Sequence, residues 1–243
     1  MNSILLLGAY SDMGQSIARK YAEAGYEIWL AGRKREKLDA LRSDLEIRWK
    51  VKALCFEFDA RDFESHGAFV NQLPGLPTVT VVIFGYLGDQ AQAVNSWDES
   101  RSIIESNYTG AVSVLNHLKG KYETKGEGTI VGISSVAGDR GRMSNFIYGS
   151  AKAGFTAYLS GLRNDLYAKG VHVVTVKPGF VATRMTEDLD LPKMLTSSAD
   201  HVADRIFSAV KKKKNTIYIS WKWRWIMLII KNIPEFVFKK LKL

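Results

Sequence analysis

The sequence predicts an α/β fold, in which one doubly wound parallel sheet of about seven strands carries helices on both faces. Short apolar runs rich in β-branched residues alternate along the chain with longer amphipathic stretches, the pattern of parallel strands joined by helical crossovers. The short runs are almost continuously apolar, as expected of strands covered on both faces. A chain of 243 residues is also long enough to bury one sizeable core.

Each element is predicted from its own pattern. The seven strands are expected at residues 4–8, 26–32, 51–58, 80–85, 128–134, 171–179 and 215–220. Helices are expected at 13–24, 34–46, 98–122 and 148–169, with a last one from about 199. No internal repeat, low-complexity segment or interdomain linker interrupts this series. We therefore expect one domain over residues 1–220 and a basic, Trp-rich, amphipathic tail over 221–243.

The formal net charge of +9 is confined to the end of the chain. Residues 211–243 hold ten Lys/Arg and one acid, whereas residues 1–210 hold 24 of each sign. This distribution argues against a nucleic-acid-binding face on the main domain. The single cysteine, Cys55, excludes an intrachain disulfide and fits a reducing compartment. Neither a signal peptide nor a run of roughly 18 apolar residues is visible, so a cytoplasmic protein is expected.

A glycine-containing turn, LLLGAYSDMGQSIA, leads from the first predicted strand into the first helix. Gly8 allows a tight turn, Gly14 lets the helix approach the strand, and the helix N-terminus offers amides to a pyrophosphate. Alone, this pattern is as typical of an ordinary strand-to-helix connection. Its position at the first βα turn of a doubly wound sheet favours dinucleotide binding and a Rossmann-type fold.

The end of the second predicted strand indicates which dinucleotide is preferred. Folds selective for NAD usually place an acid there to bind the ribose hydroxyls, but this chain has Gly32 followed by Arg33. A guanidinium suits a 2′-phosphate, so NADPH is favoured over NADH. The alternative is that Arg33, Lys34 and Arg35 form a solvated helix start.

Three residues around the fifth strand suggest proton-transfer chemistry. Tyr148 and Lys152 are four residues apart in a predicted helix and therefore share one face. A neighbouring ammonium stabilises a phenolate, which lets a tyrosine act as an acid–base catalyst. Ser135, at the end of a strand, could polarise the same substrate oxygen. A tyrosine and a lysine at this spacing usually mark only a helix surface, whereas the combination with Ser135 is much rarer.

Taken together, the motifs resemble those of the short-chain dehydrogenase/reductase family over about residues 3–220. They occur in the order Gly8 to Gly14, Asp59, Gly85, Asn107 in ESNYTGA, Ser135, Tyr148, Lys152, and Pro178–Gly179 with Thr183 in KPGFVATRM. The resemblance implies an NADP-dependent oxidoreductase that acts on CH–OH or C=O groups and forms a homodimer or homotetramer. It implies no metal.

The resemblance also implies residue roles. Tyr148 would protonate the substrate oxygen, Lys152 would lower the pKa of Tyr148 and hold the nicotinamide ribose, Ser135 would orient the carbonyl, and Asn107 would support a water in the proton relay. Asp59 would meet the adenine, and the loop from Pro178 to Thr183 would cover the nicotinamide. The implied cofactor-binding residues are Gly8, Ser11, Asp12, Met13, Gly14, Arg33, Asp59, Gly85, Lys152, Pro178, Gly179, Val181 and Thr183.

The chain departs from the family pattern at three places. Leu7 replaces a threonine, Asp12 replaces the middle glycine of the nucleotide loop, and Ile83–Phe84–Gly85 replaces Asn-Ala-Gly. Asp12 would lie near the anionic pyrophosphate. Asp12 and Gln15 have the spacing of a capping box, so we expect Asp12 to cap the first helix. Replacing Asp12 by glycine is expected to tighten NADPH binding.

The substrate is less clearly indicated. The segment RMTEDLDLPKMLTSS offers apolar walls at Met185, Leu189, Leu191 and Met194, which could equally be ordinary loop packing. The tail combines Trp221, Trp223 and Trp225 with basic residues and the block IMLII, as an in-plane membrane segment does. Residues 211–243 would then bind the anionic inner face of a membrane. Packing on the body or across an oligomer interface, and RNA contact, are the alternatives.

A membrane-bound reductase suggests a lipid-bearing substrate. YLGDQ at 86–90 and the C-terminus look similar to decaprenylphosphoryl keto-ribose 2-reductases, which reduce a keto-sugar on a polyprenyl phosphate. A 3-ketoacyl reductase would account for the same tail, and a soluble ketone reductase would need a structural tail. A non-enzymatic NADPH sensor or scaffold is a further alternative, although all four catalytic side chains are present.

Overall fold

The chain folds around a seven-stranded parallel sheet, which confirms the predicted fold class. The computed structural model describes residues 2–186 and 190–241. Strand order in the sheet is β3-β2-β1-β4-β5-β6-β9, with every neighbouring pair parallel. The strands are β1 (Ser3–Leu7), β2 (Glu27–Gly32), β3 (Ala53–Glu57), β4 (Val79–Val82), β5 (Gly128–Ile133), β6 (Val171–Lys177) and β9 (Thr216–Tyr218). A separate two-stranded pair joins β7 (Phe180–Val181) to β8 (Thr196–Ser197).

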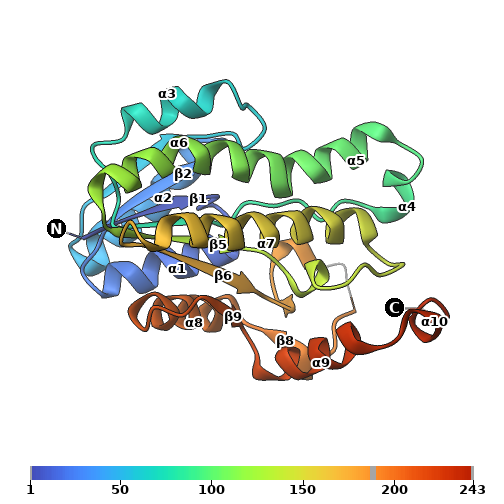
Figure 1. The fold of residues 1–243 in the computed structure, drawn as a ribbon. Helices are drawn as coiled ribbons and strands as arrows, with labels where there is room; N and C mark the ends of the chain where they lie inside the picture. The colour runs from blue at the N-terminus through green and yellow to red at the C-terminus, as the bar shows by residue number, and fades with distance from the viewer. Residues whose placement is uncertain (1, 187–189, 242–243) are drawn as a thin grey trace.

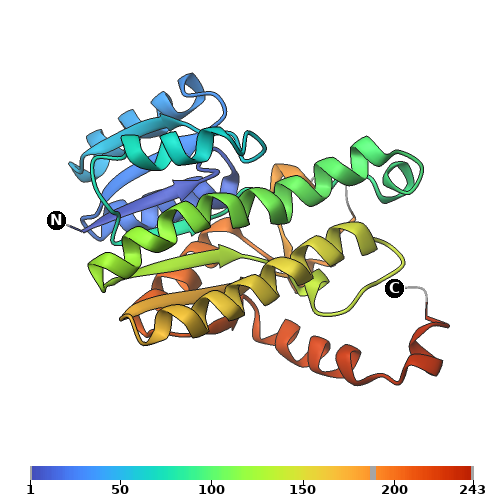
Figure 2. The ribbon, with the colours of Figure 1, turned by 45° about the horizontal axis from the view of Figure 1, so that its top comes forward.

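Helices cover both faces of the sheet, as Figures 1 and 2 show. Helices α1, α2 and α8 contribute to the core on one face, and α3, α6 and α7 to the core on the other. The α-helices are α1 (Asp12–Glu23), α2 (Glu36–Trp49), α3 (Ser65–Gln72), α4 (Gln90–Ala93), α5 (Trp97–Ile104), α6 (Gly110–Lys125), α7 (Phe146–Tyr167), α8 (Ala199–Lys211), α9 (Trp221–Asn232) and α10 (Glu235–Phe238). Short 3₁₀ turns lie at η2 (Val136–Gly138), η3 (Arg184–Thr186) and η4 (Lys193–Leu195).

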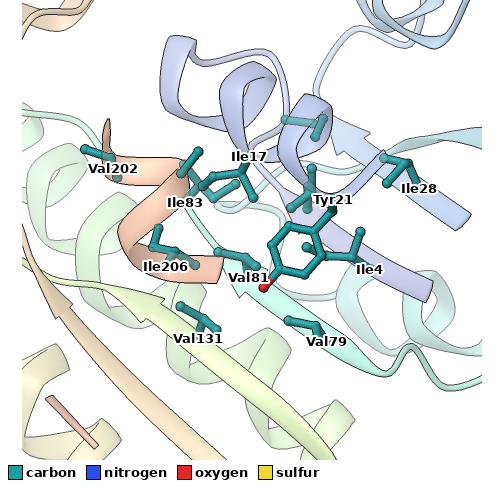
Figure 3. Close-up of a cluster of buried hydrophobic side chains, with 14 of the residues drawn as sticks. Ile4, Ile17, Tyr21, Ile28, Val79, Val81, Ile83, Val131, Val202 and Ile206 are labelled. Atoms are coloured by element: carbon teal, nitrogen blue, oxygen red, sulfur yellow. The ribbon is translucent and has the colours of Figure 1, made fainter. Parts of the chain in front are cut away.

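Strands β1 and β4 are buried because apolar side chains from both layers of helices meet them. Along β1, Ile4 and Leu6 belong to one core and Leu5 and Leu7 to the other, as the alternation of side chains along a strand requires. Figure 3 shows the first of these cores, where Tyr21 of α1 lies over the sheet beside Ile206 of α8. Burial on both faces accounts for the continuous apolar runs.

The strand order reverses direction between β1 and β4, and this defines where a ligand can bind. In a doubly wound sheet the loops at the carboxyl ends of these two strands diverge and leave a crevice. The turns after β1, β4, β5 and β6 all open at this end. Of the candidate site residues, Gly8, Gly85, Ser135 and Pro178 lie in these four turns.

The long helix predicted over 98–122 is divided into three parts. Helix α5 ends at Ile104, a π-helix, η1 (Glu105–Thr109), comes next, and α6 begins at Gly110. A π-helix carries about one extra residue per turn and is frequently found at functional sites. Side-chain periodicity could not have indicated it, because the amphipathic pattern continues across it.

The C-terminal segment is folded against the body. Helix α9 starts at Trp221 and lies beyond the carboxyl end of β6 with α10 next to it (Figures 1 and 2). Within residues 2–186 and 190–241, no helix combines the length and the hydrophobicity that a membrane span requires.

Candidate active site

The nucleotide loop is built on two glycines that no other residue could replace without a shift. Gly8 has φ +98°, and a Cβ added there would lie 2.7 Å from the backbone nitrogen of Phe84. A Cβ on Gly14 would lie 2.7 Å from the carbonyl oxygen of Ala9. The backbone of the loop is thereby pressed between β4 and α1. The first amides of α1, from Asp12 and Met13, have no carbonyl in a preceding helical turn and are available to an anion.

Asp12 does not cap α1, so that prediction is wrong. The N-cap is Ser11, whose Oγ accepts a hydrogen bond from the Gly14 amide at 3.1 Å. Both residues are good caps, but Ser11 has the extended backbone that the position needs, with ψ 155°, while Asp12 is already the first helical residue. The Asp12 carboxylate instead accepts from Arg184, from its amide at 2.8 Å and from Nε at 3.1 Å.

Arg184 thus joins the loop after β6 to the nucleotide loop. Its Nη2 donates to the carbonyl of Tyr10 at 2.7 Å, and its guanidinium lies 4.7 Å from the centre of the Tyr10 ring. No sequence pattern indicates the contact between Arg184 and Asp12, because these two residues are 172 positions apart. The only hint is the position of Arg184 directly after Thr183.

Basic side chains gather where a 2′-phosphate would be expected. Arg33 directly follows β2 and is exposed, and the ammonium of Lys37 lies 5.1 Å from the centre of the Tyr10 ring. Asp59 follows β3, where its Oδ1 accepts from the Arg61 amide at 3.0 Å. These residues fit a phosphorylated dinucleotide. Cations lie beside the position predicted for the ribose, and Gly8 and Gly14 carry no side chain that would keep a pyrophosphate away from the backbone of the nucleotide loop.

Ser135, Tyr148 and Lys152 come together at the carboxyl end of β5. Ser135 caps η2, and its Oγ accepts from the Ala137 amide at 3.1 Å, which fixes the hydroxyl. Burial raises the pKa of Tyr148 to about 12, and a hydrogen bond with Ser135 opposes that rise. At neutral pH the phenol therefore holds its proton and could donate it.

Lys152 is a buried cation, with only 4% of its surface exposed. Its Nζ donates to the carbonyl of Ile133 at 3.0 Å and lies 5.8 Å from the centre of the Tyr148 ring. Burial lowers the pKa of Lys152 to about 8, which leaves it mostly charged at neutral pH. An ammonium at this distance stabilises a phenolate formed on Tyr148.

The π-helix turns Asn107 into the site. The Asn107 side chain is buried, and its Nδ2 donates to the carbonyls of Tyr86 at 2.6 Å and Ile103 at 2.8 Å. A Cβ on Gly85 would lie 2.7 Å from Asn107 Oδ1 and 3.4 Å from Lys152 Nζ. Gly85 therefore lies between Asn107 and Lys152, and the Asn107 side chain holds the loop after β4 in place.

The loop after β6 completes the site. The carbonyl of Pro178 accepts from the Val136 amide at 2.9 Å, which ties this loop to the turn that carries Ser135. Val181 lies in β7, and the Thr183 amide donates to Thr186 Oγ1 at 3.3 Å. Gly179 is covered by the indole of Trp223, since a Cβ there would lie 1.9 Å from Trp223 Nε1.

Beyond Val181 the loop is more polar than expected. It borders a cavity of about 560 Å³ that is lined by Ala182, Thr183, Thr186, Asp190, Leu191, Lys193 and Thr196. Of the four expected apolar walls, Leu191 lines this cavity, Met185 and Met194 are exposed, and Leu189 lies outside the described residues.

Comparison with known proteins identifies the family. Residues 2–193 match the short chain dehydrogenase family model. An uncharacterized oxidoreductase of Mycobacterium tuberculosis is 35% identical over 241 residues, 98% of this chain and 96% of that protein. Sulfoacetaldehyde reductase of Chromohalobacter salexigens is 34% identical over 188 residues, 75% of this chain and 74% of that protein.

A short-chain dehydrogenase from Sphingobium yanoikuyae, solved in complex with NADPH, has the same fold. Its TM-score is 0.82 at 21% identity, and the match covers 97% of both chains. None of these comparisons supports the narrower resemblance to decaprenylphosphoryl keto-ribose reductases. The chain therefore belongs to the short-chain dehydrogenase/reductase family and is an oxidoreductase acting on CH–OH groups with an NAD(P) cofactor.

Proposed function

We propose that this protein is an NADPH-dependent reductase that converts a carbonyl to an alcohol, with Tyr148 as the proton donor. The observation that carries the proposal is the pairing of a protonated Tyr148 phenol with the buried Lys152 ammonium beside Ser135. When bound, the reduced dinucleotide supplies the hydride to the carbonyl carbon. The carbonyl π bond breaks, its oxygen takes the Tyr148 proton, and the phenolate left behind is stabilised by Lys152 and reprotonated from solvent.

The other residues have supporting roles in this proposal. Ser135 donates its hydroxyl hydrogen to the substrate oxygen, since its Oγ already accepts from the backbone. Asn107 positions the loop after β4 through its bonds to Tyr86 and Ile103. The cofactor is held by the residues named from the family resemblance, from Gly8 to Gly14, then Arg33, Asp59 and Gly85, and finally the loop from Pro178 to Thr183.

Preference for NADPH over NADH is supported by charge. Arg33 follows β2 where selectivity for NAD would call for an acid, and Lys37 lies nearby beside Tyr10. Asp12 adds a negative charge at the pyrophosphate position, but its pairing with Arg184 offsets that charge.

For the substrate, we favour a keto-sugar on a polyprenyl-phosphate carrier. Support comes from buried polar side-chain atoms on α4 and in the loop before α7 that have no hydrogen-bond partner among the described residues: Gln90 Nε2, Arg142 Nε and Asn145 Oδ1. Gln90 lies close to the start of the Tyr148 helix, because its Oε1 accepts from the Ile147 amide at 3.2 Å. These atoms would suit the hydroxyl groups of a sugar once a bound substrate opens this wall. A 3-ketoacyl chain or a soluble ketone is the alternative substrate. It has no hydroxyl groups for these three atoms, which would then bind water.

A homodimer or homotetramer is proposed to form through α6 and α7. A shallow pocket of about 290 Å³ on these helices is lined by Asn116, Lys119, Tyr158, Gly161, Leu162 and Asp165. We also propose that the protein works in the cytoplasm and reaches an anionic membrane through part of residues 211–243, a segment with a net charge of +9.

A pair of tyrosine variants tests the reaction. Tyr148→Phe is expected to keep NADPH affinity but to lose at least about a hundredfold in kcat. Tyr167→Phe is the matched control, because Tyr167 lies at the end of the same helix and is 83% exposed, away from the pocket proposed for oligomer contact. The assay measures NADPH oxidation with a keto-sugar, a 3-ketoacyl thioester and a small ketone. Equal activity of Tyr148→Phe and wild type would refute the mechanism, and NADPH binding without turnover of any carbonyl would favour a sensor.

A further inference from the structure

Helix α9 has two apolar faces, and only one of them is packed. Each residue advances about 100° around a helix, so positions 223, 226, 227 and 230 fall on one side and positions 221, 225, 228 and 229 on the other. Trp223 and Met227 are buried, with Ile226 and Ile230 packed next to them. Trp221, Trp225, Leu228 and Ile229 are 69%, 58%, 51% and 66% exposed. These last four residues are called the outer face of α9 below.

The packed side of α9 holds both loops of the active site. Trp223 Nε1 donates to the carbonyl of Leu195 at 3.0 Å, and the indole covers Gly179 and contacts the ring of Phe180 at 5.3 Å between centres. Val136, next to Ser135, belongs to the same apolar cluster. Helix α9 is therefore part of the wall behind the substrate loop and the Ser135 turn.

Arg140 fixes the far end of α9. Its Nη1 donates to the carbonyls of Ile230 at 2.7 Å and Ile233 at 2.6 Å, and its Nη2 pairs with Glu235 at 2.9 Å. The guanidinium also lies 3.7 Å from the centre of the Phe238 ring. Since Arg140 belongs to the same loop as Ser135, the orientation of α9 relative to the catalytic residues is fixed at both ends.

The outer face is bordered by cations, and exposed apolar and basic side chains follow in and just beyond α10. Arg224 and Lys231 fall on one flank of the exposed stripe and Lys222 on the other, and α9 contains no acid. In and just beyond α10, Phe236 is 67% exposed, and Lys239 and Lys240 come after it. Exposed tryptophans and aliphatic residues between lysines and arginines complement an anionic lipid surface, where apolar rings enter the headgroup layer and cations meet phosphates.

We propose that the outer face of α9 lies in the interfacial layer of an anionic bilayer and thereby holds the substrate loop and the Ser135 turn, which pack on the other side of α9, next to membrane-borne substrate. A helix of 12 residues is about 18 Å long, so it would lie in the plane of the bilayer and not cross it. The inference deepens the proposed function, because it says how a lipid-linked carbonyl reaches Tyr148.

The position of the basic run at 211–214 excludes it from the surface that α9 presents to the membrane. The carbonyl of Lys214 lies 3.1 Å from His172 Nε2, near the start of β6, whereas Tyr218 pairs with Lys177 at the end of that strand. This run is thus at the opposite end of β6 from α9. The tail predicted to bind as one segment is divided into two sites, and we assign the contact to α9.

Vesicle co-sedimentation of full-length protein tests the surface without any substrate. Wild type is expected to bind vesicles of equal parts phosphatidylcholine and phosphatidylglycerol, and to bind phosphatidylcholine alone far more weakly. The double variant Trp221→Ser/Trp225→Ser is expected to bind the anionic vesicles at least about tenfold more weakly. Trp97→Ser is the matched control, because Trp97 is 70% exposed on α5, outside α9 and α10. Full-length variants are needed, since removal of residues 221–243 would uncover Gly179 and the Ser135 loop.

The outcomes separate this inference from the proposed reaction. Turnover of a soluble ketone is expected to be unchanged by Trp221→Ser/Trp225→Ser, whereas turnover of a ketone embedded in the same vesicles is expected to fall with binding. Equal vesicle binding by wild type and the double variant would refute the proposal that the outer face of α9 binds the membrane, whatever the activity of either protein. A change of oligomeric state in the double variant, with no vesicle binding by wild type, would assign the outer face to a second copy of the chain. Vesicle binding by a wild type that turns over no ketone would count against the reaction alone.

Discussion

Replacing Lys152 by methionine should stabilise the protein while it abolishes activity. Lys152 is buried, and none of its neighbours among the described residues forms a salt bridge with it. Burial lowers its pKa from 10.5 to about 8. A shift of this size corresponds to about 3 kcal/mol of unfavourable folding free energy at neutral pH. Methionine has a similar length and no charge, so it removes this cost.

One interaction is lost in exchange. The Lys152 Nζ bond to the Ile133 carbonyl disappears, which costs about 2 kcal/mol because the donor is charged. The expected net gain is about 1 kcal/mol, or about 2–4 °C in Tm for a chain of this size. The sign of the pH dependence is set by the lowered pKa. The penalty in wild type is fully present below about pH 8 and decreases as the pH rises above that value, so the advantage of the variant should shrink in alkaline buffer.

Lys177 is a matched control of opposite sign. It is also buried, but its Nζ pairs with Asp139, whose other oxygen accepts from Tyr218 at 2.6 Å. Lys177→Met leaves a buried carboxylate without its cation, which costs about 3–5 kcal/mol and should lower Tm by at least about 6 °C. Thermal and urea unfolding of the cofactor-free proteins measure both effects. A lower Tm for Lys152→Met at neutral pH would refute the reasoning.

The remaining predictions concern the cofactor and the proton relay. The kcat for reduction should fall above about pH 8, because the ammonium of Lys152 is lost as the pH passes its pKa; a flat alkaline profile would contradict this role. Asp12→Gly should lower the Kd for NADPH about fivefold by removing an anion and freeing Arg184, and calorimetry with Arg184→Ala, expected to raise Kd, checks the sign. Arg33→Ala should weaken NADPH binding about tenfold and leave NADH unchanged, and equal losses for both would exclude a 2′-phosphate contact. Arg140→Ala should destabilise the protein by about 2 kcal/mol in urea unfolding, because α9 loses its C-terminal partner, and an unchanged midpoint would show that the contact adds no stability.

The sheet could be predicted from the sequence because its strands are buried on both faces and read as continuous apolar runs. The choice of N-cap could not, since Ser11 and Asp12 are both competent caps and the deciding partner, Arg184, is distant in sequence. The two-sided character of α9 was also hidden. Helical spacing places Trp223 opposite Trp221 and Trp225, but the sequence does not show which side packs, because the partner of Trp223, Gly179, is distant in sequence.

The π-helix at Glu105–Thr109 makes the position of Asn107 depend on the number of residues that precede it. Deleting a single residue from α5 would let the segment close into regular α-helical turns, with no change to the asparagine itself. The wide turn that directs Asn107 toward the carbonyls of Tyr86 and Ile103 would then be lost, so Asn107 would leave Gly85 even though α5 and α6 kept their places. A related protein that keeps every catalytic side chain but lacks this one extra residue would therefore be a poor catalyst. Inserting the residue would be expected to restore its activity.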